Sequence, residues 1–149
     1  MAKKYQVMRK FLFLFSLILV FSNCESDDAR TDNPFLLDVN VNVFIDLSLP
    51  QFNPLQFPNQ PIYISGAGNK GLIVNNRGNG SFDAYDASDP NHAPNNCSTL
   101  SIDGIVATCG CEDENAYNIV TGGPQTDLQY PLLRYRVLDN EDGTLRITN

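Results

Sequence analysis

The chain has 149 residues and a formal net charge of −7, a length that allows one domain of ordinary size behind a targeting segment. Residues 1–23 carry four of the ten basic residues and none of the seventeen acidic ones, so their removal leaves a net charge of −11. A surface of that charge repels phosphate groups, which argues against nucleic acid as a partner.

The first segment joins basic residues to a short apolar run. The run Phe11–Phe21 is interrupted only by Ser16 and follows four basic residues: Lys3, Lys4, Arg9 and Lys10. This pattern is typical of an export signal, and the run is shorter than the about 20 apolar residues of a membrane-spanning helix. Cys24 follows at once, so we expect a lipoprotein signal peptide over residues 1–23 and lipid attachment, palmitate included, at Cys24. The alternative is an ordinary cleaved signal that leaves a free thiol.

Residues 24–34 are mostly polar and show no periodicity. They predict a flexible tether between the lipid and a single domain over residues 35–149. The lipid anchor would hold this domain on the outer membrane of a bacterial cell envelope, facing the periplasm or the cell surface. The membrane is then one expected partner, reached through the lipid.

The remainder alternates apolar and polar residues, which predicts an all-β domain. Six apolar residues at every second position from Val39 to Leu49 predict one long half-buried strand. The four prolines of residues 50–61 favour an extended segment over a helix. Further short strands are predicted at 62–64, 71–74, 81–85, 101–102, 105–108, 117–120, 133–137 and 145–147, with tight turns at 78–80, 103–104 and 142–143. We therefore expect an antiparallel β sandwich or open barrel of about eight to ten short strands.

Three segments of the second half carry a family resemblance. They are the hairpin of residues 71–87, the strand and turn of residues 117–122, and the closing hairpin of residues 131–147. Their order resembles the Rieske iron–sulfur domain, which implies a Rieske-like fold and a [2Fe–2S] cluster held by Cys-x-His in one loop and Cys-x-x-His in the other. The same spacing falls here on Asp89-Pro90-Asn91 and Cys109-Gly110-Cys111-Glu112.

The ligand chemistry of the family is largely lost at these positions. Only Cys109 keeps its ligand type, while Asp89, Asn91 and Glu112 are degenerate positions. His92, the only histidine, lies one residue beyond the expected imidazole and, with Cys109, offers a possible metal site. Carboxylate and amide oxygens match iron–sulfide poorly, so we expect no cofactor, a [2Fe–2S] cluster being the alternative.

The surrounding polar residues have simpler interpretations. We expect His92 to be a solvated loop residue and residues 112–114 to be solvated turn charges, because that stretch, even with Asp89 opposite, lacks the acidic spacing of a calcium loop. One histidine without a Gly-x-Ser-x-Gly motif gives no support for a catalytic triad, and no phosphate-binding glycine loop is present. The sequence therefore predicts no enzyme.

The resemblance also has an implication for the cysteines. Electron-transfer members of the family clamp their two ligand loops with a disulfide, which implies Cys97–Cys111 here, with Cys97–Cys109 as the alternative and the remaining thiol buried. Cys109 and Cys111 point to opposite faces of an extended chain, so they are not expected to pair with each other.

Two functional hypotheses follow from this sequence. The first is an envelope-anchored lipoprotein whose Rieske-like domain has a degenerate cluster site and serves as a non-catalytic binding or structural module for an unidentified envelope protein. The second is a [2Fe–2S] electron-transfer protein that resembles a ferredoxin. Iron content separates the two.

Overall fold

The structure is a computed structural model that describes residues 33–149, so Cys24 and the expected signal lie outside the described residues. Among the residues described, no helix is long and apolar enough to cross a membrane. Asn33, at the end of the expected tether, is buried, and its side-chain amide donates to the carbonyl oxygen of Pro90 at 2.8 Å.

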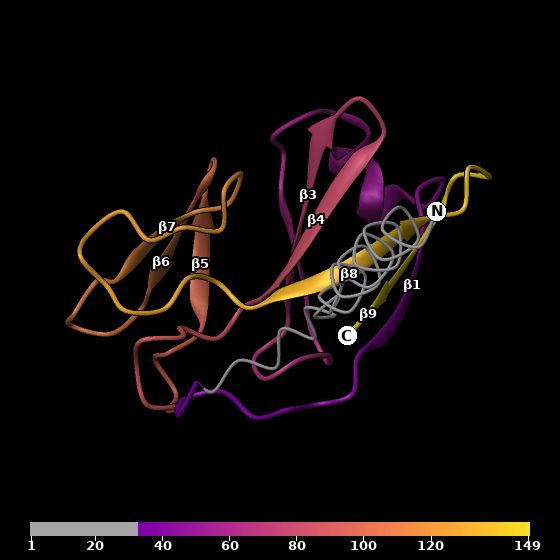
Figure 1. Cartoon of the computed structure of the whole chain (residues 1–149). Helices are drawn as coiled ribbons and strands as arrows, with labels where there is room; N and C mark the ends of the chain where they lie inside the picture. Colours follow the sequence, from indigo (N-terminus) through magenta and orange to yellow (C-terminus); the bar gives the residue numbers. More distant parts are fainter. Residues whose placement is uncertain (1–32) are drawn as a thin grey trace, which may run out of the picture. The chain divides into compact units, whose positions relative to one another are not determined.

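Nine strands and one 3₁₀ helix make up the described region, and every strand pairing is antiparallel (Figure 1). The elements are β1 (Asn42–Asp46), η2 (Pro50–Gln56), β2 (Ile62–Ile64), β3 (Leu72–Gly78), β4 (Ser81–Asp86), β5 (Leu100–Asp103), β6 (Val106–Cys109), β7 (Ala116–Asn118), β8 (Arg134–Asp139) and β9 (Thr144–Thr148). The prediction of an all-β antiparallel fold with eight to ten short strands is confirmed.

The strands form two sheets. A six-stranded sheet has the order β1-β9-β8-β4-β3-β2, and a three-stranded sheet, β5-β6-β7, lies beside it (Figure 1). The β3–β4 hairpin turns through Asn79 and Gly80, whose φ angles of 55° and 71° lie in the left-handed region that these two residue types tolerate best. The local turn signals of the sequence therefore set this hairpin register.

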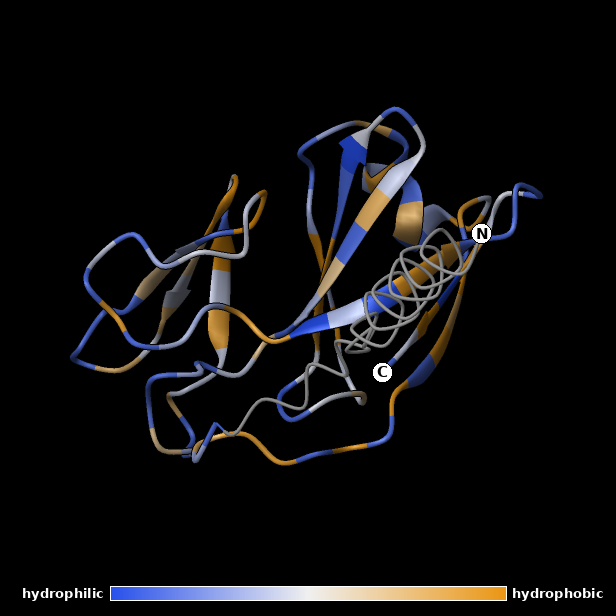
Figure 2. Ribbon diagram, in the orientation of Figure 1, coloured by the Kyte–Doolittle hydropathy of each residue, from blue (hydrophilic) through white to orange (hydrophobic). Residues whose placement is uncertain are grey.

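Each sheet buries the apolar side of its alternating strands. Figure 2 shows the alternation of hydropathy along β4. One core cluster fills the concave side of the six-stranded sheet and includes Val41, Ile45 and Leu145. A second cluster joins Ile73 and Tyr85 of that sheet to Ala107 and Tyr117 of the smaller one, so the two sheets pack on shared apolar residues.

Two expectations for the first segment were wrong in extent or type. The first strand spans only Asn42–Asp46, because the carboxylate of Asp46 accepts hydrogen bonds from the backbone N–H (2.9 Å) and hydroxyl (2.6 Å) of Ser48 and turns the chain there. The proline-rich segment is not extended but forms η2, with Pro50 at its start, where no N–H donor is needed. Its Leu55 is fully buried against the sheet, and this packing favours the helical turns.

Candidate functional site

The two loops with the family spacing meet at one end of the three-stranded sheet. The first loop, residues 87–99, connects β4 to β5, and the second loop, residues 110–115, connects β6 to β7. The backbone N–H of Gly110 donates to the carbonyl oxygen of Cys97 at 3.1 Å. A Cβ atom on Gly110 would lie 2.9 Å from that oxygen, so only glycine allows the two loops to approach this closely.

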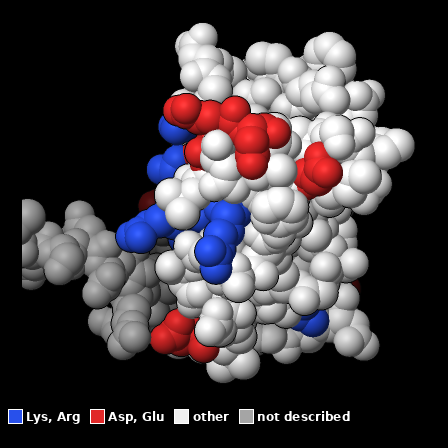
Figure 3. Space-filling view, turned by 90° about the vertical axis from the view of Figure 1, so that its right-hand side faces the viewer, with Lys and Arg blue, Asp and Glu red and all other residues white. Residues whose placement is uncertain are grey.

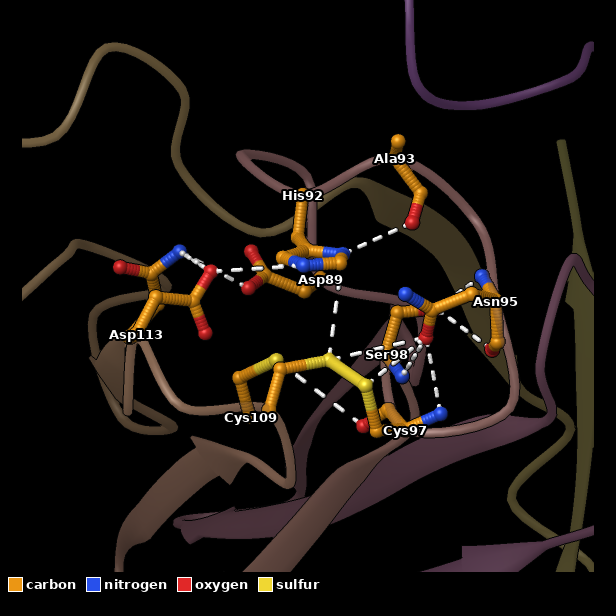
Figure 4. Close-up of a disulfide and its surroundings, with 10 residues drawn as sticks. Asp89, His92, Ala93, Asn95, Cys97, Ser98, Cys109 and Asp113 are labelled. Atoms are coloured by element: carbon orange, nitrogen blue, oxygen red, sulfur yellow. Dashed lines mark hydrogen bonds and ion pairs between the residues drawn. A yellow bond between two sulfur atoms is a disulfide. The ribbon is translucent and has the colours of Figure 1, made fainter.

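A disulfide joins the loops at this contact (Figure 4). It links Cys97 to Cys111 with a Cα–Cα distance of 5.0 Å, the pairing that the family resemblance implied. Cys109 is free and buried, as expected for the third cysteine. The sulfur of Cys111 is therefore committed to the disulfide, and Cys109 supplies the thiol of this site.

Asp89, at the position of a family cysteine, is a fully buried carboxylate. It accepts hydrogen bonds from the backbone N–H of Asn91 at 2.8 Å, the side-chain amide of Asn115 at 3.0 Å and the hydroxyl of Tyr117. These donors come from both loops and from β7. Asp89 thus acts as a polar centre around which the loops are ordered.

Asn91, at the position of a family histidine, has both ends of its amide occupied. Its NH₂ group donates to the hydroxyl of Tyr117 at 2.9 Å and to the carbonyl oxygen of Tyr130 at 2.7 Å. Its oxygen accepts from the backbone N–H of Tyr130 at 2.9 Å. Asn91 therefore connects the first loop to the segment before β8, and its side chain is not available as a ligand.

Burial perturbs the two titratable groups that touch Asp89. Burial, and to a smaller extent the hydrogen bond to Asp89, raises the pKa of the Cys109 thiol to about 12. The pKa of the Tyr117 hydroxyl is also raised, first by burial and then by its hydrogen bond to Asp89. Both groups hold their protons at neutral pH, so the buried carboxylate has neutral donors around it.

His92 lies in the first loop, as expected, but it is only partly solvated. Its side chain is only 24% exposed, and Nδ1 lies 2.7 Å from the carbonyl oxygen of Ala93 and 3.9 Å from the sulfur of Cys111. Its Nε2 lies 3.7 Å from a carboxylate oxygen of Asp113 (Figure 4). The disulfide holds the second loop beside the first, so the carboxylate of Asp113 faces the imidazole of His92. Asp113 is therefore not a purely solvated turn charge either.

The donor set does not fit a [2Fe–2S] cluster. Such a cluster takes four soft ligands, two of them thiolates in the Rieske arrangement. Of the four positions with the family spacing, Cys109 alone carries sulfur, Asp89 offers a hard carboxylate oxygen, Asn91 is held in hydrogen bonds, and Glu112 is exposed at the surface. The residues form a hydrogen-bonded junction between two loops instead of a cluster cage.

Sequence reasoning missed two residues of this junction, Asn115 and Tyr117, and interpreted Asp113 only as a solvated turn charge. Asn115 donates to the carboxylates of both Asp89 (3.0 Å) and Asp113 (3.2 Å), and Tyr117 donates to Asp89 from β7. Tyr117 was assigned only a strand position. Its phenolic hydroxyl at an inward-facing strand position is the signal that could have indicated a buried hydrogen-bond partner.

Comparisons with known proteins give only remote likeness. No family model matches the chain, and no curated protein matches it. A chain from a complex of reduced oxygenase and oxidized ferredoxin in carbazole 1,9a-dioxygenase is 19% identical, with a TM-score of 0.45 over 75% of this chain and 94% of that one. A chain assigned as the small subunit of an NADH-dependent nitrite reductase from Mycobacterium tuberculosis is 16% identical, with a TM-score of 0.45 over 75% and 97%. Because these identities and TM-scores are low, the chemistry of this chain is inferred from its own residues.

Proposed function

We propose that this chain is the precursor of a lipid-anchored envelope protein whose Rieske-like domain works without a [2Fe–2S] cluster, as a non-catalytic binding or structural module. The observation that carries the proposal is the replacement of cluster ligands by a hydrogen-bonded junction. Asp89 and Asn91 stand at two ligand positions and are both engaged with Tyr117. Ligand loops that are already joined by a disulfide and by these bonds need no cluster to hold them together.

Iron reconstitution tests the absence of a cluster. The full-length chain is purified, incubated anaerobically with Fe²⁺ and sulfide, and desalted, and its iron content and visible absorption are measured. We expect a colourless protein with no more iron than a Cys109→Ala variant, which lacks the thiol of the site. Two irons per chain in the unmodified protein, with a paramagnetic signal on reduction, would instead establish the electron-transfer alternative.

The lipid anchor is tested separately, because it depends on Cys24 and not on the junction. We expect the chain to stay in the membrane fraction of a bacterial host and the Cys24→Ser variant to leave it. Cys109→Ser is the matched control, since it removes another cysteine and keeps the lipid site. A Cys24→Ser variant that stays with the membrane after detergent-free washing would contradict lipidation.

The outer side of the six-stranded sheet supports a binding role. By register, Arg146 of β9 lies between Phe44 of β1 and Leu138 of β8, and these two apolar side chains are 64% and 49% exposed. Figure 3 shows basic side chains gathered in the middle of one face with acidic ones around them. The domain carries excess negative charge, but this face combines exposed apolar side chains with arginines. Such a patch can bind an envelope protein with an acidic surface. A photoreactive residue at Phe44 should crosslink to that partner, whereas one at Tyr63, on β2, should not.

A further inference from the structure

The junction brings together more metal-binding atoms than the family pattern alone indicates. The thiol sulfur of Cys109 and carboxylate oxygens of Asp89 and Asp113 lie within 4.8 Å of one another. Asp113 also belongs to a second group of the same size, with His92 and Cys111. Since the sulfur of Cys111 is held in the disulfide, the available donors are one thiol, one imidazole and two carboxylates.

We propose that Asp89, Cys109 and Asp113, with His92 on the solvent side, form a binding site for a single Zn²⁺ ion. This goes beyond the proposed function and does not depend on the lipid anchor. The ion would lie beside the disulfide, with Asp89 and His92 from the first loop, Asp113 from the second loop and Cys109 from the end of β6. On binding, the thiol proton of Cys109 passes to solvent and the thiolate coordinates the ion.

The orientation of His92 is a second and independent reason for a cation here. Its Nδ1 lies 2.7 Å from the carbonyl oxygen of Ala93, so Nδ1 carries a hydrogen and donates it. Nε2 is then left facing the Asp113 carboxylate at 3.7 Å, beyond hydrogen-bond distance. Metal-binding histidines characteristically donate their other ring N–H to a backbone carbonyl in this way. A cation held between Nε2 and the Asp113 carboxylate would satisfy both groups.

Asn115 provides the outer support that such a site requires. Its single NH₂ group donates to Asp89 at 3.0 Å and to Asp113 at 3.2 Å, and so holds two carboxylates toward one point. Two like charges at this separation repel each other, and a cation between them removes the repulsion. Access is open from one side, because the side chains of His92 and Asp113 are 24% and 33% exposed.

The mixture of donor atoms selects the ion. Zn²⁺ accepts sulfur, nitrogen and oxygen ligands and is commonly four-coordinate, which matches one thiolate, one imidazole and two carboxylates. Ca²⁺ takes six to eight oxygen ligands and does not seek a thiolate. An iron–sulfur cluster requires more thiolates than the one that remains.

Metal binding to the full-length chain tests the site. The protein carries Cys24→Ser, so that Cys109 is the free thiol, has no histidine tag, and is kept without reductant to preserve the disulfide. Zn²⁺ is measured by equilibrium dialysis, and Co²⁺ is used as a spectroscopic substitute. We expect one Zn²⁺ per chain and a sulfur-to-cobalt charge-transfer absorption that Cys109→Ser abolishes. Asn115→Ala should weaken Zn²⁺ binding by about 10- to 100-fold, and Asp113→Asn by at least as much.

The matched control is Glu114→Gln, which removes one negative charge from an exposed position of the same loop. It should leave the affinity within about twofold of the unmodified protein, because screened surface charge contributes little. Asp113 is also exposed, so Asp113→Asn is not expected to disturb folding, and circular dichroism verifies this for Cys109→Ser. Equal losses from Asp113→Asn and Glu114→Gln, or a cobalt complex without the charge-transfer band, would overturn the proposal. Absence of bound Zn²⁺ would overturn it as well.

Discussion

Replacing Asn91 by alanine tests whether its side-chain amide is a structural link between the first loop and the segment before β8. Its side chain makes three hydrogen bonds, to the hydroxyl of Tyr117 and to the N–H and carbonyl groups of Tyr130. Each is worth about 1 kcal/mol in a partly buried setting, so Asn91→Ala should lower the free energy of unfolding by about 3 kcal/mol. The loss should appear in urea unfolding as a lower midpoint with an unchanged slope, because the surface exposed on unfolding stays the same.

The control for this prediction is Asn96→Ala, in the same loop. Asn96 is exposed, so its replacement should change the free energy of unfolding by less than about 0.5 kcal/mol. An Asn91→Ala protein that unfolds within about 0.5 kcal/mol of the unmodified chain would refute the junction. In that case the conformation of the first loop would not depend on the amide, and Asn91 would be free to serve another purpose.

Three further predictions concern the frame around the site. Replacing both half-cystines by serine should cost about 3 kcal/mol, since the bridged residues are 14 apart in sequence, and reductant should lower the melting temperature of the unmodified protein to that of the variant. Burial, with the nearby Asp86 carboxylate, raises the pKa of Tyr135 above its usual 10.0. Unfolded chains therefore lose this proton before folded ones do, so stability should fall as the pH rises above 10. Tyr135→Phe should flatten that alkaline loss in a pH series of unfolding measurements. Gly122→Ala should cost about 1–3 kcal/mol by thermal denaturation, because φ is +75° and the new Cβ would lie 2.8 Å from Tyr85.

The strands and their turns were predictable because their signals are local. Alternation placed Ile45 and Leu145 in the core, and both are fully buried. Asn79 and Gly80 marked a hairpin because few other residues adopt their backbone angles. The 3₁₀ helix was not predicted, because prolines indicate only that a long α-helix or a central strand is disfavoured. The burial of Leu55 that stabilises η2 depends on the rest of the sheet.

The interactions of the candidate site were not predictable in the same way. Asn91 and Tyr130 are 39 residues apart, and Asp89 and Tyr117 are 28 apart, so no short pattern connects them. Family spacing marked Asp89 and Asn91 as positions of interest and left their new partners unknown. The disulfide was expected only through the resemblance, since the distance between two cysteines in sequence does not set their distance in space.

Asp89 and Asn91 make physical sense as a pair. The hydroxyl of Tyr117 lies in a fully buried side chain and must both donate and accept a hydrogen bond to avoid an energetic penalty. The carboxylate of Asp89 accepts a hydrogen bond from this hydroxyl, and the amide of Asn91 donates one to its oxygen, so the pair satisfies both needs at once. Asp89→Cys or Asn91→His alone would leave part of the Tyr117 hydroxyl unpaired, at a cost of about 1–3 kcal/mol. The junction is therefore a stable arrangement of these loops, and Asp89→Cys or Asn91→His alone should weaken the fold.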